Sequence, residues 1–132
     1  MISGCRGRDS SEGSEHYLEG AQYPLEIHFV HVNLKYGNLA VALASGQSDA
    51  LLVVGQMFAV GTRQSATMDT IVDGIVAGDF EKERSLVMSD LMDSSHGYYT
   101  YPGSLTTPKC NPIVTWVVLA SVLDITQVII TC

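Results

Sequence analysis

Hydrophobic and polar residues alternate most regularly in the stretch LEIHFVHV at residues 25–32. Because β-branched and aromatic residues dominate this stretch and turn-forming residues flank it, it is predicted to be a β-strand. Side chains of a strand alternate between its two faces. Glu26, His28 and Val30 should therefore share one face, and His31 should lie on the other.

The pair formed by Glu26 and His28 is a candidate for metal chemistry. A carboxylate beside a histidine can accept the proton of one ring nitrogen, which leaves the other nitrogen to bind a metal. The alternative is a core histidine that a neighbouring glutamate satisfies, and lone histidines are more often of that kind. This stretch alone leaves both interpretations open.

Two more segments have a clear period. Residues 50–60 are strongly apolar, which predicts a strand buried on both faces, with Gly55 marking a bulge or a close approach of backbone. A helical stripe predicts a helix over residues 67–77, begun by Ser65 or Thr67. The apolar positions of this stripe are Met68, Ile71, Val72, Ile75 and Val76.

The remaining segments are shorter. Residues 98–101 are predicted to form a strand that Pro102 and Gly103 end, residues 113–119 form the next strand, and residues 121–132 are again β-like. Residues 39–44 are apolar but of ambiguous type. Many strands, one clear helix and long loops predict a mainly β domain with a mixed sheet.

Composition narrows the function. The chain has 132 residues and a net charge of −7, which suits one domain and argues against nucleic acid or anionic membranes as partners. No stretch reaches the roughly 18 apolar residues of a membrane span, and the first residues lack the apolar core of a signal peptide. The three cysteines, Cys5, Cys110 and Cys132, are an odd number, so they cannot all pair within one chain.

Three stretches together resemble the α-class carbonic anhydrases. They are GSEH at residues 13–16, YPLEIHFVHVN at 23–33 and YYTYPGSLTTPKCNPIVTW at 98–116, in the family's order and spacing. The resemblance covers about residues 7–119. It implies that residues 1–132 form a single partial domain, part of the family's central twisted and mostly antiparallel sheet, without the N-terminal and C-terminal parts of the family domain.

The resemblance also implies a zinc site and roles for particular residues. His28 matches a zinc ligand and Glu26 the carboxylate that holds its ring. Thr106 matches the threonine that accepts a hydrogen bond from zinc-bound hydroxide, and Glu15 matches the carboxylate that orients this threonine. Zinc lowers the pKa of bound water to about 7, which gives the hydroxide that attacks carbon dioxide and forms bicarbonate. The residues implied beside the substrate are Val30, Val53, Leu105, Thr107, Val114 and Trp116.

Departures from the family pattern predict that this chain is inactive or severely impaired. The family's other two zinc ligands form a His-x-His pair, and these positions fall on Ser3 and Cys5. A catalytic zinc needs three protein ligands, and Cys5 could supply at most one beside His28. Cys110 resembles a cysteine that secreted members pair with one near their own N-terminus, so the parent protein is expected to be extracellular.

Three interpretations stay open at this point. The chain is an incomplete copy of a zinc-dependent carbonate dehydratase, a lyase; or a non-catalytic carbonic-anhydrase-like protein that binds a partner or serves a structural role; or a truncated product without an independent role. A truncated sheet is also predicted to associate with itself through exposed edges. A His-x-His sequence encoded upstream would favour the first interpretation.

Overall fold

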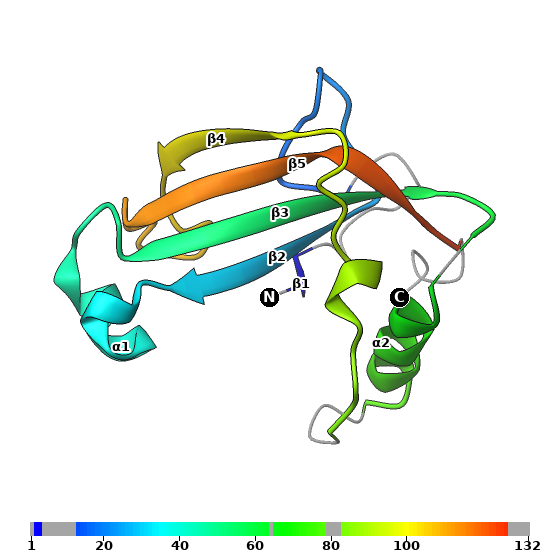
Figure 1. Cartoon of the computed structure of the whole chain (residues 1–132), viewed down its shortest axis with the longest axis horizontal. Coiled ribbons are helices and arrows are strands. Elements are labelled where there is room, and N and C mark those ends of the chain that lie inside the picture. Colours follow the sequence, from blue (N-terminus) through cyan, green and yellow to red (C-terminus); the bar gives the residue numbers. More distant parts are fainter. Residues whose placement is uncertain (1, 4–12, 64, 79–82, 127–132) are drawn as a thin grey trace.

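The computed structural model describes residues 2–3, 13–63, 65–78 and 83–126. Their centre is a five-stranded sheet in the order β1-β2-β3-β5-β4 (Figure 1). The strands are β1 (Ile2–Ser3), β2 (Leu25–Val32), β3 (Leu51–Val60), β4 (Tyr98–Gly103) and β5 (Val114–Ile125). The helices are α1 (Leu39–Ser45) and α2 (Ala66–Val76), with 3₁₀ turns η1 (Leu34–Tyr36) and η2 (Met88–Asp90).

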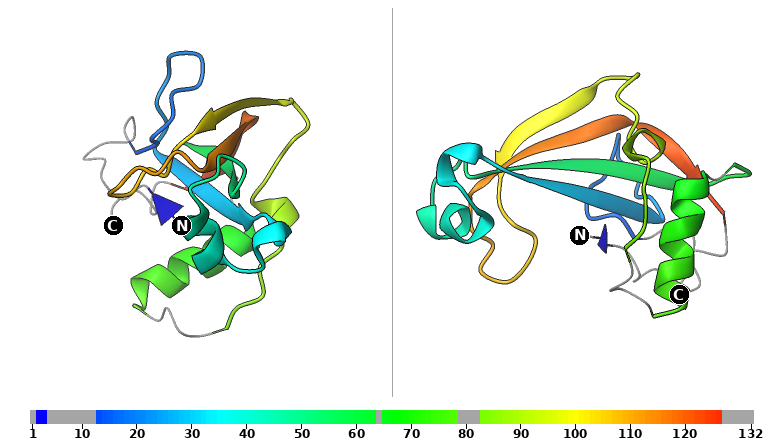
Figure 2. Two further views of the ribbon diagram at one scale, coloured as in Figure 1. Left: turned by 90° about the vertical axis from the view of Figure 1, so that its left-hand side faces the viewer. Right: turned by 60° about the horizontal axis from the view of Figure 1, so that its bottom comes forward.

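The sheet is mixed, which confirms the predicted fold class. β3 and β5 run parallel, and every other neighbouring pair of the described strands is antiparallel. Helices α1 and α2 lie at opposite ends of the sheet (Figure 2). Among the described residues, no helix combines the length and the hydropathy that crossing a membrane requires.

Strand β2 has the alternation that its sequence predicts. Leu25 and Ile27 lie on one face, in an apolar cluster with Phe58 of β3 and Met68 of α2. Glu26 and His28 are buried on the other face. The strand therefore separates an apolar core from a polar group of side chains.

Helix α2 begins one residue before its predicted start. The Ser65 hydroxyl accepts a hydrogen bond from the Met68 amide at 3.2 Å, so Ser65 caps the helix. Thr67 is engaged elsewhere, because its hydroxyl donates to the Asp90 carboxylate at 2.8 Å. Of the two caps that the sequence left open, the structure uses Ser65.

Two boundaries differ from the sequence predictions. β4 continues through Pro102 to Gly103, because it is an edge strand of the described sheet and an edge strand tolerates a residue without an N–H donor. β5 is one strand from Val114 to Ile125 rather than two segments, and residues 127–132 lie outside the described part. The ambiguous segment 39–44 lies in α1, where the Asn38 side chain accepts from the Val41 amide at 3.0 Å.

Gly55 marks both a bulge and a close approach. The register between β3 and β5 shifts between Gly55 and Met57. Gly55 lies opposite His28 in the pairing of β2 with β3, and a Cβ added to it would lie 2.9 Å from Oε1 of Glu26. The glycine therefore makes room for the Glu26 carboxylate.

Candidate metal centre

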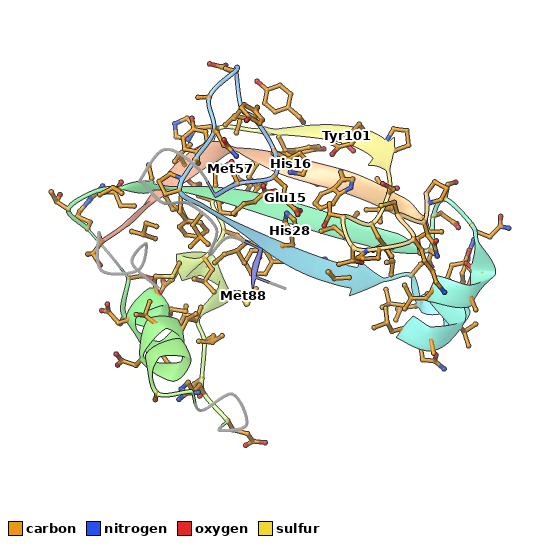
Figure 3. The ribbon with its side chains drawn as sticks, turned by 180° about the vertical axis from the view of Figure 1, so that it is seen from behind. Glu15, His16, His28, Met57, Met88 and Tyr101 are labelled. Atoms are coloured by element: carbon orange, nitrogen blue, oxygen red, sulfur yellow. The ribbon has the colours of Figure 1, made fainter. Side chains whose placement is uncertain are left out.

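The candidate site lies over the middle of the sheet (Figure 3), where Glu15, His16, His28 and Tyr101 gather. Glu26 and His28 come from β2, and Tyr101 comes from the edge strand β4. Glu15 and His16 belong to the segment before β2, which doubles back through a bridge between Leu18 and Ala21. Residues far apart in the sequence are thus brought to one face.

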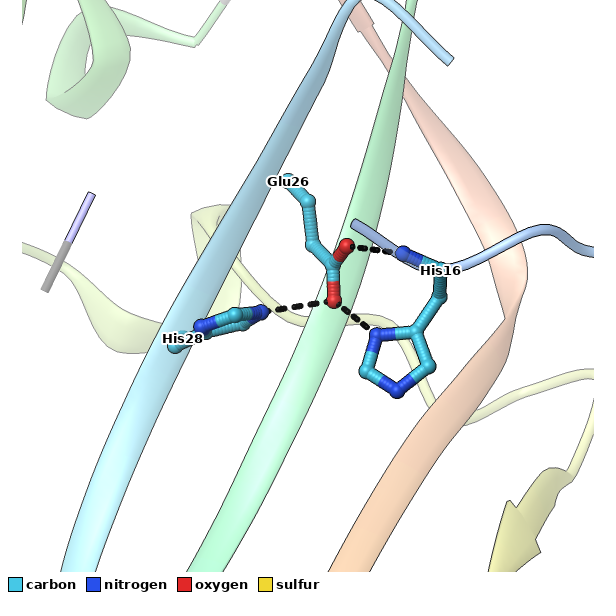
Figure 4. Close-up of side chains that lie close together, drawn as sticks. All are labelled: His16, Glu26 and His28. Atoms are coloured by element: carbon cyan, nitrogen blue, oxygen red, sulfur yellow. Dashed lines mark hydrogen bonds and ion pairs between the residues drawn. The ribbon is translucent and has the colours of Figure 1, made fainter. Parts of the chain in front are cut away.

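Glu26 is the centre of this group and has no exposed surface. Its Oε1 lies 2.5 Å from Nδ1 of His16 and 2.7 Å from Nε2 of His28 (Figure 4). Its Oε2 accepts hydrogen bonds from the backbone amides of Glu15 and His16, both at 2.9 Å. An ionised carboxylate accepts about four hydrogen bonds, so these contacts saturate Glu26.

The same contacts determine the charge of Glu26. Burial alone would raise its pKa, but the hydrogen bonds from the His16 and His28 side chains and from the His16 backbone lower the pKa to about 2. Glu26 is therefore ionised at neutral pH. A carboxylate without a proton can only accept hydrogen bonds, so both imidazoles donate to it.

This assigns a role to each ring nitrogen. Nε2 of His28 carries the proton given to Glu26, so in the neutral ring Nδ1 carries the lone pair, and it lies 3.9 Å from Oε2 of Glu15. Nδ1 of His16 also donates to Glu26, and its Nε2 lies 2.5 Å from the Tyr101 hydroxyl. Partial burial and the Glu26 charge raise the pKa of Tyr101. The phenol therefore keeps its proton and donates a hydrogen bond to Nε2 of His16.

Trp116 packs against both histidines. Its ring centroid is 4.8 Å from that of His16 and 4.8 Å from that of His28, in edge-to-face arrangements. Tyr101 stacks on the same indole at 6.5 Å. The indole N–H donates to the backbone oxygen of Ser104 at 3.1 Å. Trp116 therefore joins the histidines to the loop that follows β4.

His16, Glu26 and His28 bring three potential metal-ligating atoms within 4.8 Å of one another. Two atoms bound to one tetrahedral zinc at about 2.0–2.1 Å lie about 3.3 Å apart, whereas the Glu26 contacts to the two rings measure 2.5 and 2.7 Å. These are hydrogen-bond distances, and both nitrogens of His16 are engaged. This group therefore fits a support for a ligand better than a set of three ligands, and the described residues do not fit a complete zinc site.

Among the other implied site residues, the apolar ones gather. Val53, Val114 and Trp116 are buried in one cluster, with Leu105 packed against it. Val30 lies opposite Val53 in the sheet and is 44% exposed. Thr107 is exposed.

The implied pair of Thr106 and Glu15 is not joined by a hydrogen bond within the part of the chain that the structure describes. Thr106 is exposed, and Oε2 of Glu15 lies toward His28 instead. The roles assigned to these two residues stay predictions. Cys5 lies outside the described residues, and Cys110 is an exposed free thiol.

Sequence reasoning had assigned no site role to His16, Tyr101 or Gly55. His16 stands in the GSEH motif next to Glu15, which was a usable signal. Tyr101 lies 85 residues from His16 along the chain, and no local pattern connects them. Gly55 was noted only as a bulge or close approach, without the atom that approaches it.

Comparison with known proteins agrees with this geometry. The family model for eukaryotic-type carbonic anhydrases matches residues 6–131. Mouse carbonic anhydrase 7 is 34% identical over 126 residues, covering 92% of this chain and 47% of that protein. Bovine carbonic anhydrase 6 is 36% identical over 129 residues, covering 92% of this chain and 40% of that protein. Bovine carbonic anhydrase 3 is 31% identical over 125 residues, with coverage of 92% and 47%.

The chain belongs to the eukaryotic-type carbonic anhydrase family. It spans about half the length of the curated relatives it matches, or slightly less. The family is generally zinc-dependent, and within the described part of the chain the His16–Glu26–His28 group brings potential metal-ligating atoms together.

Proposed function

We propose that the protein's function is reversible hydration of carbon dioxide to bicarbonate, and that residues 1–132 form a partial domain carrying the substrate side of that site. The apolar cluster around Val53, Val114 and Trp116 suits carbon dioxide, which is apolar. His28 would be one zinc ligand, because the ionised Glu26 accepts the hydrogen bond from its Nε2, which leaves Nδ1 as the ring nitrogen with the lone pair.

We further propose that the 132-residue polypeptide by itself does not hydrate carbon dioxide. The observation that carries this is the saturation of Glu26 by four hydrogen bonds, from His16, His28 and two amides. Of the two histidines in that network, His16 has both ring nitrogens hydrogen-bonded, so His28 is the one that suits a ligand. A catalytic zinc needs three such ligands.

The test is stopped-flow hydration of carbon dioxide with added zinc, together with the zinc content after dialysis. We expect turnover at the background rate and less than one zinc per chain. Sulfonamide-sensitive turnover with one zinc retained per chain would contradict the proposal. The variant His28→Ala is the matched control, since turnover through zinc at this site must disappear with it.

A non-catalytic role is the second candidate, and one observation favours it. The network of His16, Glu26 and Tyr101 is satisfied without a metal, because each polar atom has a protein partner. A binding or structural protein would need no metal to keep these side chains hydrogen-bonded. A transcript that encodes a His-x-His pair upstream of residue 6 would decide for the catalytic candidate.

Self-association through sheet edges belongs to the same proposal. β1 pairs with Glu26 and Ile27, and residues 29–32 have no strand partner on that edge among the described residues. On the other edge, Tyr98 and Tyr99 of β4 are more than half exposed. Unpaired apolar edges promote pairing with further strands. Light scattering should give a mass above that of one chain, and a monodisperse monomer would contradict this.

We also propose that the protein is extracellular, on the strength of Cys110. Its thiol is exposed and unpaired among the described residues, at a position where secreted family members are expected to carry a disulfide. Differential alkylation and mass spectrometry of the native protein should find Cys110 oxidised. A reduced Cys110 in the native protein would count against an extracellular location.

A further inference from the structure

A fully buried glutamine lies beneath the histidine–glutamate network. Gln56 has no exposed surface and stands on β3 between Gly55 and Met57. It lies opposite Ile27, whereas Gly55 lies opposite His28 and Met57 opposite Glu26. By strand alternation its side chain points to the face away from the network. It is the polar member of an otherwise apolar strand.

Hydrogen bonds use the whole amide of Gln56. Its Nε2 donates to the backbone oxygens of Met57 at 3.0 Å and Ser121 at 2.7 Å. Its Oε1 accepts from the backbone amide of Asp93 at 3.0 Å. The Ser121 hydroxyl in turn donates to the backbone oxygen of Asp93. Gln56 thus ties three segments together: β3, β5 and the loop before β4.

The bulge explains why a polar side chain is needed at this point. Gly55 pairs with Val118 and Met57 pairs with Val122, so Gln56 alone faces the residues 119–121 of β5. The regular ladder is interrupted there, and buried backbone groups need other partners. The Gln56 amide supplies a donor for Ser121 and an acceptor for Asp93.

The position of this bulge matters for Glu26. A Cβ on Gly55 would lie 2.9 Å from Oε1 of Glu26 and 3.9 Å from Cδ2 of His28. The backbone of β3 at Gly55 therefore lies close to the carboxylate, with no room for a side chain between them. A displacement of this backbone would change the space around the oxygen that accepts both imidazole protons.

We propose that Gln56 is a positioning residue of this site: its amide replaces the ladder hydrogen bonds that the bulge removes and so holds Gly55 beneath the Glu26 carboxylate. The inference rests on the proposed function, in that Glu26 and His28 are the site being positioned. Its readouts require neither zinc nor turnover. Its failure is therefore distinguishable from the failure of the proposed function.

The test compares Gln56→Met with Ser121→Ala in the whole chain. Methionine keeps much of the size of glutamine but cannot donate a hydrogen bond, whereas Ser121→Ala removes only the hydroxyl bond to Asp93. The readouts are the ring N–H proton resonances of His16 and His28 and the hydrogen exchange of the Asp93 amide. All three protons are hydrogen-bonded in the native structure.

In Gln56→Met we expect the ring proton resonances to shift or to be lost, and the Asp93 amide to exchange at least about tenfold faster. In Ser121→Ala we expect the ring resonances to keep their positions. A folded Gln56→Met chain with unchanged ring resonances would overturn the proposal. So would equal shifts in the two variants.

The wild-type chain gives a second test, which does not depend on how the variants fold. At increasing denaturant, the Asp93 amide and the two ring protons should exchange through one common opening, because the Gln56 amide and the Gly55 backbone beside Glu26 move together. If Asp93 opens far below the denaturant concentration that releases the ring protons, Gln56 does not position the site.

Discussion

Two regions of the molecule carry the residues implied to act in the site, and they differ in how they are held. Glu26 and His28 of β2 are buried, and hydrogen bonds connect Glu26 to His16 of the segment before β2 and His16 to Tyr101 of β4. The loop between β4 and β5 carries Thr106 and Thr107, which are exposed. The first region is positioned by the sheet, and the second by a few bonds at its ends.

The loop has identifiable anchors. The Leu105 amide donates to the backbone oxygen of Asn111 at 3.0 Å, and the Cys110 amide donates to that of Thr107 at 3.0 Å. Lys109 and Cys110 have φ angles of 88° and 42°, a region that residues other than glycine seldom adopt. The loop is therefore a tight turn, and its residues 106–110 are exposed. The sheet therefore fixes the positions of Glu26 and His28, which β2 carries. The position of the Thr106 side chain depends on the loop and on contacts that the loop makes.

The largest expected effect comes from removing the centre of the network. Glu26→Ala leaves two imidazoles and two backbone amides without their acceptor, and breaking a buried charged group of this kind costs about 3–5 kcal/mol. We expect the free energy of unfolding in urea to fall by about this amount, with a transition that can still be measured. Glu83→Gln, at an exposed position, is the matched control and should change the midpoint little. Unchanged unfolding of Glu26→Ala would show that the network does not stabilise the fold.

Gly55→Ala should have the next largest effect. The new Cβ meets Oε1 of Glu26 at 2.9 Å, and overpacking in a close-packed region costs about 1–3 kcal/mol. The free energy of unfolding, measured by denaturant titration, should fall by this amount. In a Glu26→Ala background the added cost should be much smaller, because the atom that the Cβ meets has been removed. Equal costs in both backgrounds would locate the strain elsewhere.

Tyr101→Phe tests the outer end of the network. It removes the hydroxyl that donates to Nε2 of His16, a single hydrogen bond worth about 1 kcal/mol. The emission of Trp116, the chain's one tryptophan, should also change, since Trp116 stacks on Tyr101 and contacts His16. Tyr98→Phe, on the same strand and 62% exposed, is the control. Equal emission changes in the two variants would argue against a specific contact.

Thr106→Val should have the smallest effect. Thr106 is exposed, and surface substitutions of this kind change stability by about 0.5 kcal/mol or less. We expect the urea midpoint and the Trp116 emission to match those of the wild type. A loss of stability comparable to that of Tyr101→Phe would mean that the loop is held as firmly as the network around Glu26. The two regions would then not differ in how they are held.

Local sequence determined the strands and much of the site. The period of two in residues 25–32 placed Glu26 and His28 on one face, and the structure has them hydrogen-bonded. The apolar run at 50–60 and the helical stripe at 67–77 became β3 and α2 within a residue or so. These predictions succeeded because backbone geometry alone sets which side chains share a face.

Tertiary structure alone decided what surrounds Glu26 and Gly55. His16 comes from the segment that doubles back before β2, and Tyr101 comes from the far edge of the sheet. Gln56 donates a hydrogen bond to Ser121, which lies 65 positions further along the chain. Pro102 remains in a strand because β4 is at the edge of the described sheet. No local period encodes such contacts, since they depend on strand order and register, and a buried carboxylate keeps its charge only where those place enough donors around it.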